Sequence, residues 1–385
     1  MYDEARPLLF QLPDEAREIQ RTVAALSARH QDPLEARMLA GETLTRADYR
    51  PGREAAKAAG LWGLGLPAEL GGADLPLLHR LAATEQAMRC VAPLEFGGAV
   101  FPALLTSNAA VKAKYLTRAL NDDLVVAFAQ TEAGGGADPG AAIRTRAVMR
   151  GGRWVINGSK TFISRVAAAD VIFVVAVTDD AKRQRGGISL FAVDPDNPGL
   201  RIGRRIPVLG GREVHELYFD DCAVDADMML GGEGAGFRNA QIALSAARFS
   251  VGVRSLGIAQ RAYEMMVAHA KTRESFGGPL AEKQAVQAMI VDSWIEIEQV
   301  RLLAWQAAEK ADHGHDVRME AGMIKMLGTE LSARVLDRAI QIHGAAGVAL
   351  DGPLAYFYAE QRPSRIYEGP SEVHKHHVMA RRLLA

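Results

Sequence analysis

The chain has 385 residues, of which 49% are hydrophobic and 24% are charged, and its formal net charge is -1. This length exceeds what one hydrophobic core usually serves, so two or three domains are expected. The near-neutral charge argues against a nucleic-acid-binding protein and against attraction to an acidic membrane. Cys90 and Cys222 are too few and too far apart to indicate a disulfide framework or a metal cluster, which is typical of a reducing cytosol.

The start of the chain shows no targeting pattern. Asp3, Glu4 and Arg6 precede the apolar residues 8–10, which does not match a signal peptide. No apolar run is long enough to span a bilayer. We therefore expect a cytoplasmic protein without nucleic-acid or membrane partners.

Helical periodicity occupies the chain as far as about residue 120. The first pattern follows Pro13 and is expected to stop at Pro33. Further helices are predicted over residues 45–59, 77–88 and 109–120. These patterns predict a helical N-terminal domain over residues 1–123.

The pattern changes near Leu124, where short β-branched or aromatic runs predict strands. The predicted strands cover residues 124–130, 142–150, 153–157, 160–164, 170–177, 187–193 and 214–219. Turn pairs such as Gly151-Gly152 and Asn157-Gly158 separate these strands, and the second pair is interpreted as a hairpin turn. Because no helices intervene, an antiparallel sheet or small barrel is expected rather than a parallel nucleotide-binding sheet. The middle β-barrel domain is predicted over residues 124–233.

Long helical patterns return after Gly236 and predict helices over residues 237–272, 280–312 and 318–343. Helices of this length are typical of an antiparallel bundle. A C-terminal four-helix bundle domain is therefore expected over residues 234–385. The predicted fold class is α+β, in the order helical, β, helical.

A turn sequence, Ile366-Tyr-Glu-Gly-Pro-Ser-Glu-Val-His374, places Glu368 just before a predicted helix that runs from Ser371 to Leu384. A carboxylate on a Gly-Pro elbow, with Tyr367 beside it and little charge nearby, is a candidate general base, because partial burial raises its basicity. The alternative is a solvated Glu in a surface turn. The residues expected to line one face of the helix are Val373, His377, Val378 and Leu383 or Leu384.

Three other features have competing interpretations. The glycine-rich segment 131–138 follows an apolar strand, and its backbone N–H groups can hold an anion or the polar edge of a flavin; otherwise it is a flexible surface loop. The segment 231–236 looks like a dinucleotide fingerprint but lacks the βαβ context, so it is interpreted as a domain link. The cluster of His374, His376 and His377 lacks the spacing of a metal site, so no metal is expected.

Eight motifs then occur in a characteristic order: Leu61-Trp-Gly-Leu-Gly-Leu-Pro67 with Gly71-Gly72, the Thr131-Glu132 loop, Val155-Ile-Asn-Gly-Ser-Lys-Thr-Phe-Ile-Ser164, Leu256-Gly-Ile-Ala-Gln260, Arg273 with Phe276-Gly277, Gln284, Gln341-Ile-His-Gly344 and Tyr367-Glu-Gly369. In this combination the sequence resembles the acyl-CoA dehydrogenase family of flavoproteins over essentially its whole length. The resemblance implies FAD-dependent α,β-dehydrogenation of an acyl-CoA thioester to the trans-2-enoyl-CoA.

The resemblance also implies how the reaction is divided among groups. Glu368 would take the α-proton while the β-hydrogen leaves as hydride to flavin N5. The backbone N–H of Glu368 and a ribityl hydroxyl of FAD would bind the thioester oxygen and stabilise the developing enolate charge. Electrons would then pass to an electron-transferring flavoprotein.

Most of the implied contacts are with FAD. Phe128, Gln130 and Thr131 correspond to the strand end at the flavin ring, Phe162 to the aromatic residue beside it, and Ser164 to the hydroxyl at N5. The residues implied to contact the FAD of a neighbouring subunit are Arg273, Phe276 and Gln284, with Gln341, Gly344 and Ala345 near the pyrophosphate. Gly136, Ala137 and Ser371 complete the cofactor set. A complete site would therefore need a homo-oligomer, either a dimer or a tetramer.

The substrate set implied by the resemblance consists of Ser245, Arg248, Tyr367 and Gly369, with Arg248 at the CoA portion. A helix-surface ion pair is the alternative for Arg248. Some relatives carry their base immediately before this Arg, where this chain has Ala247, so the assignment of the base to Glu368 gains support.

This chain departs from the family pattern at several positions: Ala137 replaces a common Ser, Ala345 a Gly, Ala359-Glu360 an Arg-Asp pair, and Pro370 a frequent Thr. These changes affect details of pyrophosphate and CoA binding but leave Glu368 and Ser164 in place. Two other functions stay open: a flavin-dependent oxidase or monooxygenase, and a non-catalytic flavoprotein subunit.

Overall fold

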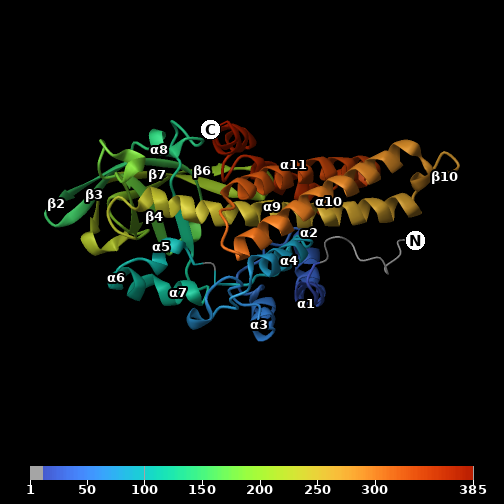
Figure 1. Cartoon of the computed structure of the whole chain (residues 1–385), viewed down its shortest axis with the longest axis horizontal. Helices are drawn as coiled ribbons and strands as arrows, with labels where there is room; N and C mark the ends of the chain where they lie inside the picture. Colours follow the sequence, from blue (N-terminus) through green and yellow to red (C-terminus); the bar gives the residue numbers. More distant parts are fainter. Residues whose placement is uncertain (1–11, 99, 385) are drawn as a thin grey trace. The chain divides into compact units, whose positions relative to one another are not determined.

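The computed structural model describes residues 12–98 and 100–384 (Figure 1). Residues 3–10, for which no signal peptide is predicted, lie outside this range. The chain forms two compact units: one contains the described residues up to Phe96 and from Ser245 onward, and the other contains Gly97–Leu244. The order helical, β, helical along the chain is confirmed. The three predicted domain ranges stay a prediction, and compactness groups residues 97–123 with the sheet.

The first unit is built from helices. They are α1 (Asp14–His30), α2 (Asp32–Leu39), α3 (Arg50–Ala58), α4 (Leu77–Ala87), the part of α9 (Gly236–Thr272) from Ser245 onward, α10 (Gln284–Asp312), α11 (Arg318–His343) and α12 (Pro353–Gln361). Helix α11 has buried residues in every turn from Ala321 to Ile342, so it is a central helix of this unit. Its neighbours include α10 and α12.

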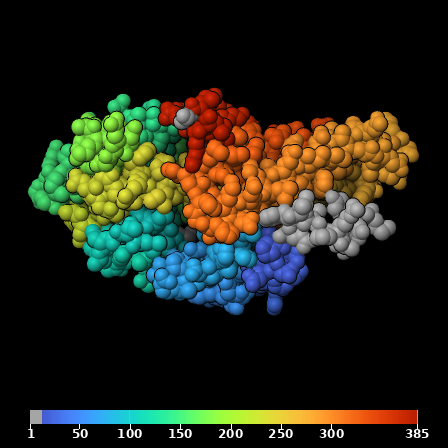
Figure 2. All heavy atoms as spheres, viewed as in Figure 1, coloured from blue at the N-terminus to red at the C-terminus, as the bar shows by residue number. Residues whose placement is uncertain are grey.

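The apolar core of this unit explains why these helices associate. Leu256 of α9, Ile297 of α10, Leu331 of α11 and Phe357 of α12 are buried in one hydrophobic cluster. Removing such side chains from water is the main force that holds helices together. Figure 2 shows α10 (orange) at the surface, and this helix also leaves several apolar side chains exposed, namely Val291, Trp294, Ile295 and Leu302.

The effect of Pro33 differs in part from the prediction. Helix α1 does end before it, at His30, but Pro33 then lies in the first turn of a further helix, α2. A proline is tolerated there because the first N–H groups of a helix have no partner within the helix.

The C-terminal helix is present, but the residues expected to line one of its faces do not form its buried face. It consists of α13 (Ser371–Val373), a π-helical segment (His374–Ala380) and α14 (Arg381–Leu383). His374 is fully buried, whereas His377 and Leu384 are exposed. A π-helix has i→i+5 hydrogen bonds, so the spacing of 3.6 residues used for the prediction does not hold here.

The second unit contains a sheet of eight strands: β1 (Val126–Ala129), β2 (Arg146–Arg150), β3 (Arg153–Ser164), β4 (Val171–Val177), β5 (Ile188–Val193), β6 (Leu200–Pro207), β7 (Glu213–Asp225) and β8 (Met229–Leu230). The strand order is β6-β7-β3-β2-β4-β5-β8, and β1 also pairs with β4. Most pairs are antiparallel, as predicted, but β4 pairs in parallel with both β1 and β2. The rest of this unit consists of α5 (Pro102–Leu105), α6 (Ala109–Val111), a π-helical turn (Lys112–Leu116), α7 (Thr117–Leu120), α8 (Pro139–Ala142) and the start of α9.

The predicted hairpin at Asn157-Gly158 is wrong, because both residues lie inside the single strand β3. The register against β7 shifts between Ile156 and Gly158, so this is a bulge. Gly158 has φ +145°, and a Cβ there would lie 2.6 Å from the hydroxyl of Thr145, so glycine is required for close packing rather than for a turn. The predicted turn at Gly151-Gly152 is confirmed, because these two residues join β2 and β3 in a hairpin and both have positive φ angles.

Strand β6 was not predicted. Its sequence, LRIGRRIP, contains three arginines, and no residue in it is fully buried. It lies at the edge of the sheet, where it pairs only with β7. Edge strands need little apolar pattern, and charged side chains on them oppose aggregation.

Among the described helices, only α9 is long and apolar enough to cross a membrane by length and composition. Half of its most apolar window is buried inside the protein, and the core helix of a globular protein passes the same test.

Candidate active site

The segment with Glu368 is a tight turn before α13, in the helical unit. Glu368 has φ +58° and Gly369 has φ +93°, both in the left-handed region. This conformation is unusual for a residue with a side chain, and such strain is found preferentially at functional sites. A Cβ on Gly369 would lie 3.1 Å from Nε2 of His374, so glycine is also needed for space.

Three helical segments fix the carbonyl groups of this turn. The carbonyl oxygen of Glu368 accepts a hydrogen bond from Nε of Arg248 on α9 (3.4 Å) and lies 3.2 Å from Nε2 of His374. The carbonyl oxygen of Gly369 accepts a hydrogen bond from Nζ of Lys325 on α11 (2.7 Å). The prediction of little charge near Glu368 is therefore wrong, because two cations distant in sequence are folded against it.

The carboxyl group of Glu368 has a raised pKa and an unpartnered oxygen, which are properties expected of a general base. Burial raises its pKa above the ordinary value of 4.5, and the positive charges of Arg248 and Lys325 oppose this shift only in part. Its Oε2 is buried, and no group among the described residues donates a hydrogen bond to it. A buried carboxylate oxygen without a partner is costly, so such an atom indicates a position where another group is bound or a proton is taken up.

His374 is a structural part of the turn. Burial lowers its pKa to about 4, so the ring is neutral at physiological pH, and one ring nitrogen carries a proton. Its Nδ1 faces Gly322 of α11, where a Cβ would lie only 3.0 Å away. Sequence analysis considered His374 only as a possible metal ligand and did not find this role.

A second set of polar contacts fixes the two ends of the turn. Glu330 of α11 accepts a hydrogen bond from the hydroxyl of Ser371 at 2.8 Å and forms a 2.8 Å ion pair with Arg365. The hydroxyl of Ser371, which was assigned to the cofactor, is therefore used inside the protein. Neither Glu330 nor Arg365 was identified from the sequence, because neither belongs to the motifs.

The sheet unit contains a buried ion pair next to the glycine-rich loop. Lys160 of β3 donates to Oε1 of Glu132 at 2.7 Å and to the carbonyl oxygen of Gln130 at 3.1 Å. Glu132 also accepts hydrogen bonds from the backbone N–H groups of Arg144 and Thr145 and from the Thr145 hydroxyl. Burial opposes ionisation, but Lys160 and these donors lower the pKa of Glu132 below its usual value. The pair fastens the residues just after β1 to β3.

Several residues assigned to the flavin lie close to this pair. Gln130 has a buried Oε1 without a partner among the described residues, and the carbonyl of Thr131 accepts the N–H of Thr161 at 2.9 Å. Phe162 is 58% exposed and has φ +56°, and Ser164 is exposed at the end of β3. Phe128 lies on β1 and packs against Phe101. An exposed aromatic ring and an orphaned amide oxygen fit the face and polar edge of a flavin ring.

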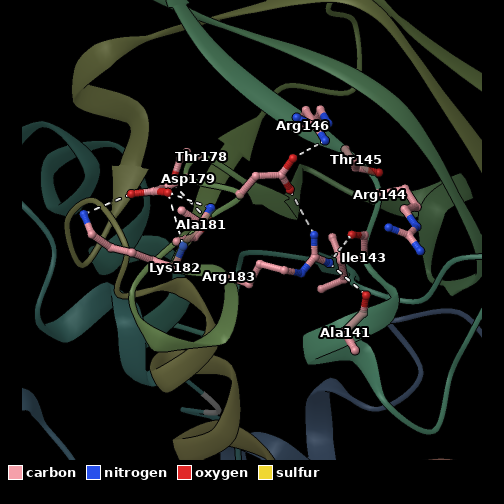
Figure 3. Close-up of polar contacts among 12 residues, drawn as sticks. Ala141, Ile143, Arg144, Thr145, Arg146, Thr178, Asp179, Ala181, Lys182 and Arg183 are labelled. Carbon is pink, nitrogen blue, oxygen red and sulfur yellow. Dashed lines mark hydrogen bonds and ion pairs between the residues drawn. The ribbon is translucent and has the colours of Figure 1, made fainter.

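The glycine-rich loop itself is mostly exposed, including Gly136 and Ala137. Asp138 then caps α8 by accepting the N–H of Ala141. Beyond the loop, Arg183 donates to the carbonyls of Ala141 and Ile143, at 2.9 and 2.8 Å (Figure 3). The loop is thus fixed at both ends, and within it the N–H of Gly135 donates to the carbonyl oxygen of Glu132 at 3.1 Å.

The remaining cofactor residues lie at exposed positions of the helical unit. Phe276 is 97% exposed in the turn between the short strands β9 (Glu274–Ser275) and β10 (Gly278–Pro279), and Arg273 and Gln284 are also exposed. Gln341, Gly344 and Ala345 are exposed at the C-terminal end of α11 and just beyond it.

Of the residues assigned to the substrate, Arg248 and Gly369 meet at the Glu368 turn, as described above. Tyr367 is half exposed beside Glu368, and Ser245 lies on α9, one turn before Arg248. Within the described part of the chain, no group of three or more His, Cys, Asp or Glu side chains is arranged to hold a metal ion.

Comparison with known proteins agrees with this geometry. Three family profiles match successive parts of the chain: "Acyl-CoA dehydrogenase, N-terminal domain" at residues 13–123, "middle domain" at 127–222 and "C-terminal domain" at 234–384. One relative, (R)-benzylsuccinyl-CoA dehydrogenase of Thauera aromatica, is 33% identical over 385 residues, which is 95% of each chain.

Solved structures are also similar. Butyryl-CoA dehydrogenase of Megasphaera elsdenii has a TM-score of 0.84 at 26% identity and covers 98% of this chain and 100% of its own. A structure described as the FAD complex of PigA has a TM-score of 0.87 at 25% identity, with coverage of 98% and 99%.

Fold, site and similarity together place this protein in the class of flavin-dependent oxidoreductases. The chain belongs to the acyl-CoA dehydrogenase family. Membership implies FAD as the cofactor and an acyl-CoA as the substrate.

Proposed function

We propose that this protein catalyses the α,β-dehydrogenation of an acyl-CoA thioester to the trans-2-enoyl-CoA, with Glu368 as the base. One observation carries the proposal: a carboxylate of raised pKa, whose outer oxygen is buried without a partner, sits on a strained turn. A general base works best when its pKa lies near the working pH, and burial moves Glu368 in that direction.

In this mechanism the ionised carboxylate of Glu368 receives the α-proton of the substrate at Oε2. The proton leaves a carbon next to a thioester carbonyl, so negative charge develops on the carbonyl oxygen. The backbone N–H of Glu368 donates no hydrogen bond among the described residues, which leaves it for this oxygen. A fixed donor of this kind stabilises the enolate-like charge as it forms.

The residues proposed to hold FAD in this chain are Gln130 and Thr131 at the polar edge of the ring, Phe162 at its face and Ser164 near N5. When bound, the flavin supplies the acceptor for the β-hydrogen, which departs as hydride. Arg248 is proposed to bind the CoA portion. An electron-transferring flavoprotein as the acceptor and a cytoplasmic location are also part of this proposal.

An anaerobic titration of the purified flavoprotein with a panel of acyl-CoA esters tests the proposal. At least one ester should bleach the flavin absorbance of the wild type. The Glu368→Gln variant should still bind FAD and the ester, but bleaching should be slower by about 10³-fold or more, because the amide cannot accept the proton.

The control is Glu309→Gln, the same change at an exposed position of α10, which should bleach at the wild-type rate. Bleaching of Glu368→Gln at that rate would show that another base acts. If no ester bleaches the wild-type flavin, the dehydrogenase assignment is wrong, and an oxidase or a non-catalytic subunit becomes the better description.

A further inference from the structure

A second charged group at the catalytic turn has no role in the chemistry described above. Lys325 lies in the interior of α11, and its side chain is 0% exposed. Its ammonium donates to the backbone carbonyl of Gly369 at 2.7 Å. Burying an ammonium group costs free energy, and among the described residues no carboxylate forms a salt bridge with Lys325, which is unusual for a lysine in a protein core.

The charged groups around Lys325 show which side chain its ammonium group acts on. The groups that act on it are Glu368, Arg248, Glu330 and Glu372, and among them Glu368 has the largest effect. Burial lowers the pKa of Lys325 to about 8, so the group is charged at neutral pH. In return, Lys325 and Arg248 are the two cations that favour the ionised form of Glu368.

Lys325 differs from Arg248 in accessibility and in the quality of its contact. Arg248 is partly exposed and reaches the turn through a long contact of 3.4 Å. Lys325 has no exposed atoms and a short contact, so it acts on the substrate only through the turn that it holds. Lys325 is therefore suited to position the turn, whereas Arg248 is accessible enough to bind the substrate.

We propose that Lys325 is a positioning residue for the base: its ammonium fixes the Gly369 carbonyl, and with it the direction of the Glu368 side chain, and its charge keeps Glu368 ionised in a buried site. This inference rests on the proposed function of Glu368. Fixing the peptide directly after the base matters because a displacement of about 1 Å can cost about 100-fold in rate.

Two substitutions separate the two effects. Lys325→Met removes both the charge and the hydrogen bond, whereas Lys325→Gln removes the charge but keeps an N–H donor for Gly369. The control is Lys310→Met, the same change in an exposed ion pair with Glu320 on the surface of this unit. The readout is the pH dependence of single-turnover flavin reduction, with the ester that bleaches the wild type fastest.

Both Lys325 variants should move the acidic limb of this profile to higher pH by about one pH unit, because Glu368 then loses a cation that favours its ionised form. The high-pH plateau should fall by about tenfold in Lys325→Met and by less in Lys325→Gln. An acidic limb that stays at the wild-type pH in both folded variants would overturn the inference, while Glu368 as the base would stand. A wild type that is not reduced by any ester would instead count against the proposed function.

A measurement on the unmodified protein covers the case in which the variants do not fold. In protein labelled with ¹³C at the Glu side-chain carboxyl groups, the Glu368 resonance is assigned by its absence in Glu368→Gln. Besides its own titration, it should show a smaller second step near pH 8, where Lys325 loses its proton. His374 titrates near pH 4 and Arg248 stays charged, so among the groups facing Glu368 only Lys325 changes there. A flat resonance between pH 7 and 9 would contradict the inference.

Discussion

At the scale of single residues, packing shifts the pKa values of side chains in the turn that carries Glu368. Burial raises the pKa of Glu368 while the cations Arg248 and Lys325 oppose that rise, and burial holds His374 neutral. The neutral state of His374 makes the stability of the protein sensitive to acid.

His374 should make the free energy of unfolding fall between about pH 6.5 and about pH 4. In the unfolded chain the imidazole has its ordinary pKa of 6.5, whereas in the folded protein it is about 4. The unfolded state therefore takes up a proton first as the pH falls, and the stabilisation present above pH 6.5 is lost through this window. The shift corresponds to about 3 kcal/mol.

Urea unfolding at a series of pH values checks this prediction. His374→Gln should lack about 3 kcal/mol of the loss that the wild type shows between pH 6.5 and 4. His377→Gln, the same change at an exposed position three residues later, should follow the wild type. Parallel curves for the wild type and His374→Gln would show that the ring is not held neutral.

At the scale of elements, β3 carries Phe162 and Ser164, which are proposed to contact the flavin, and also the buried Lys160, whose partner Glu132 lies at the start of the glycine-rich loop. The ion pair from Lys160 of β3 to Glu132 fixes the N-terminal end of the glycine-rich loop to this strand. The contact is fully buried, so it behaves differently from a surface salt bridge.

Lys160→Met should destabilise the protein by about 3 to 5 kcal/mol, because it leaves a buried carboxylate without its counter-charge. FAD affinity should fall as well, since the carbonyl of Gln130 loses its donor. Urea unfolding of the apoprotein and FAD titration by fluorescence measure the two effects.

The matched control is Lys114→Met, whose ion pair with Asp194 is about half exposed and should be worth less than about 1 kcal/mol. Adding Glu132→Gln to Lys160→Met should restore part of the lost stability, because no charge is then left buried. Equal losses for Lys160→Met and Lys114→Met would mean that the buried pair contributes no more than a surface pair.

At the scale of the whole molecule, the exposure of the residues proposed to contact FAD bears on whether one chain can complete the site. Arg273 and Phe276 are exposed on the connection between α9 and α10, Gln284 is exposed at the start of α10, and α10 leaves Trp294 and Ile295 uncovered. Exposed aromatic and aliphatic side chains on one helix are typical of a surface that another chain covers. We therefore propose that a homo-oligomer completes the site.

Arg273→Ala should weaken FAD binding by about tenfold or more without changing the elution volume in gel filtration, because a hydrogen bond to a charged group is lost across the interface. Lys271→Ala, at an exposed position two residues earlier, is the control and should retain FAD. The flavin content of each eluted species gives the result. A monomer that holds FAD stoichiometrically would refute the shared site.

The sequence alone determined the order of the elements, the central helix over residues 318–343, and the positions of the glycine loop and the Glu368 turn. These features follow from local periodicity and from short motifs, both of which consist of residues close together in the sequence. The sequence also led to errors where one pattern has two structural outcomes. Asn157-Gly158 fits a hairpin as well as a bulge, and the spacing of 3.6 residues fails in the π-helical segment after Val373.

Only the tertiary structure decided the electrostatics of the site. Arg248 and Lys325 precede the residues they contact, Glu368 and Gly369, by 120 and 44 positions, so no local pattern shows that both lie against the Glu368 turn. Burial, which sets the protonation states of Glu368, Lys325 and His374, is likewise a property of packed helices. The physical reason is that desolvation and charge interactions depend on distance in space, whereas a sequence gives only distance along the chain.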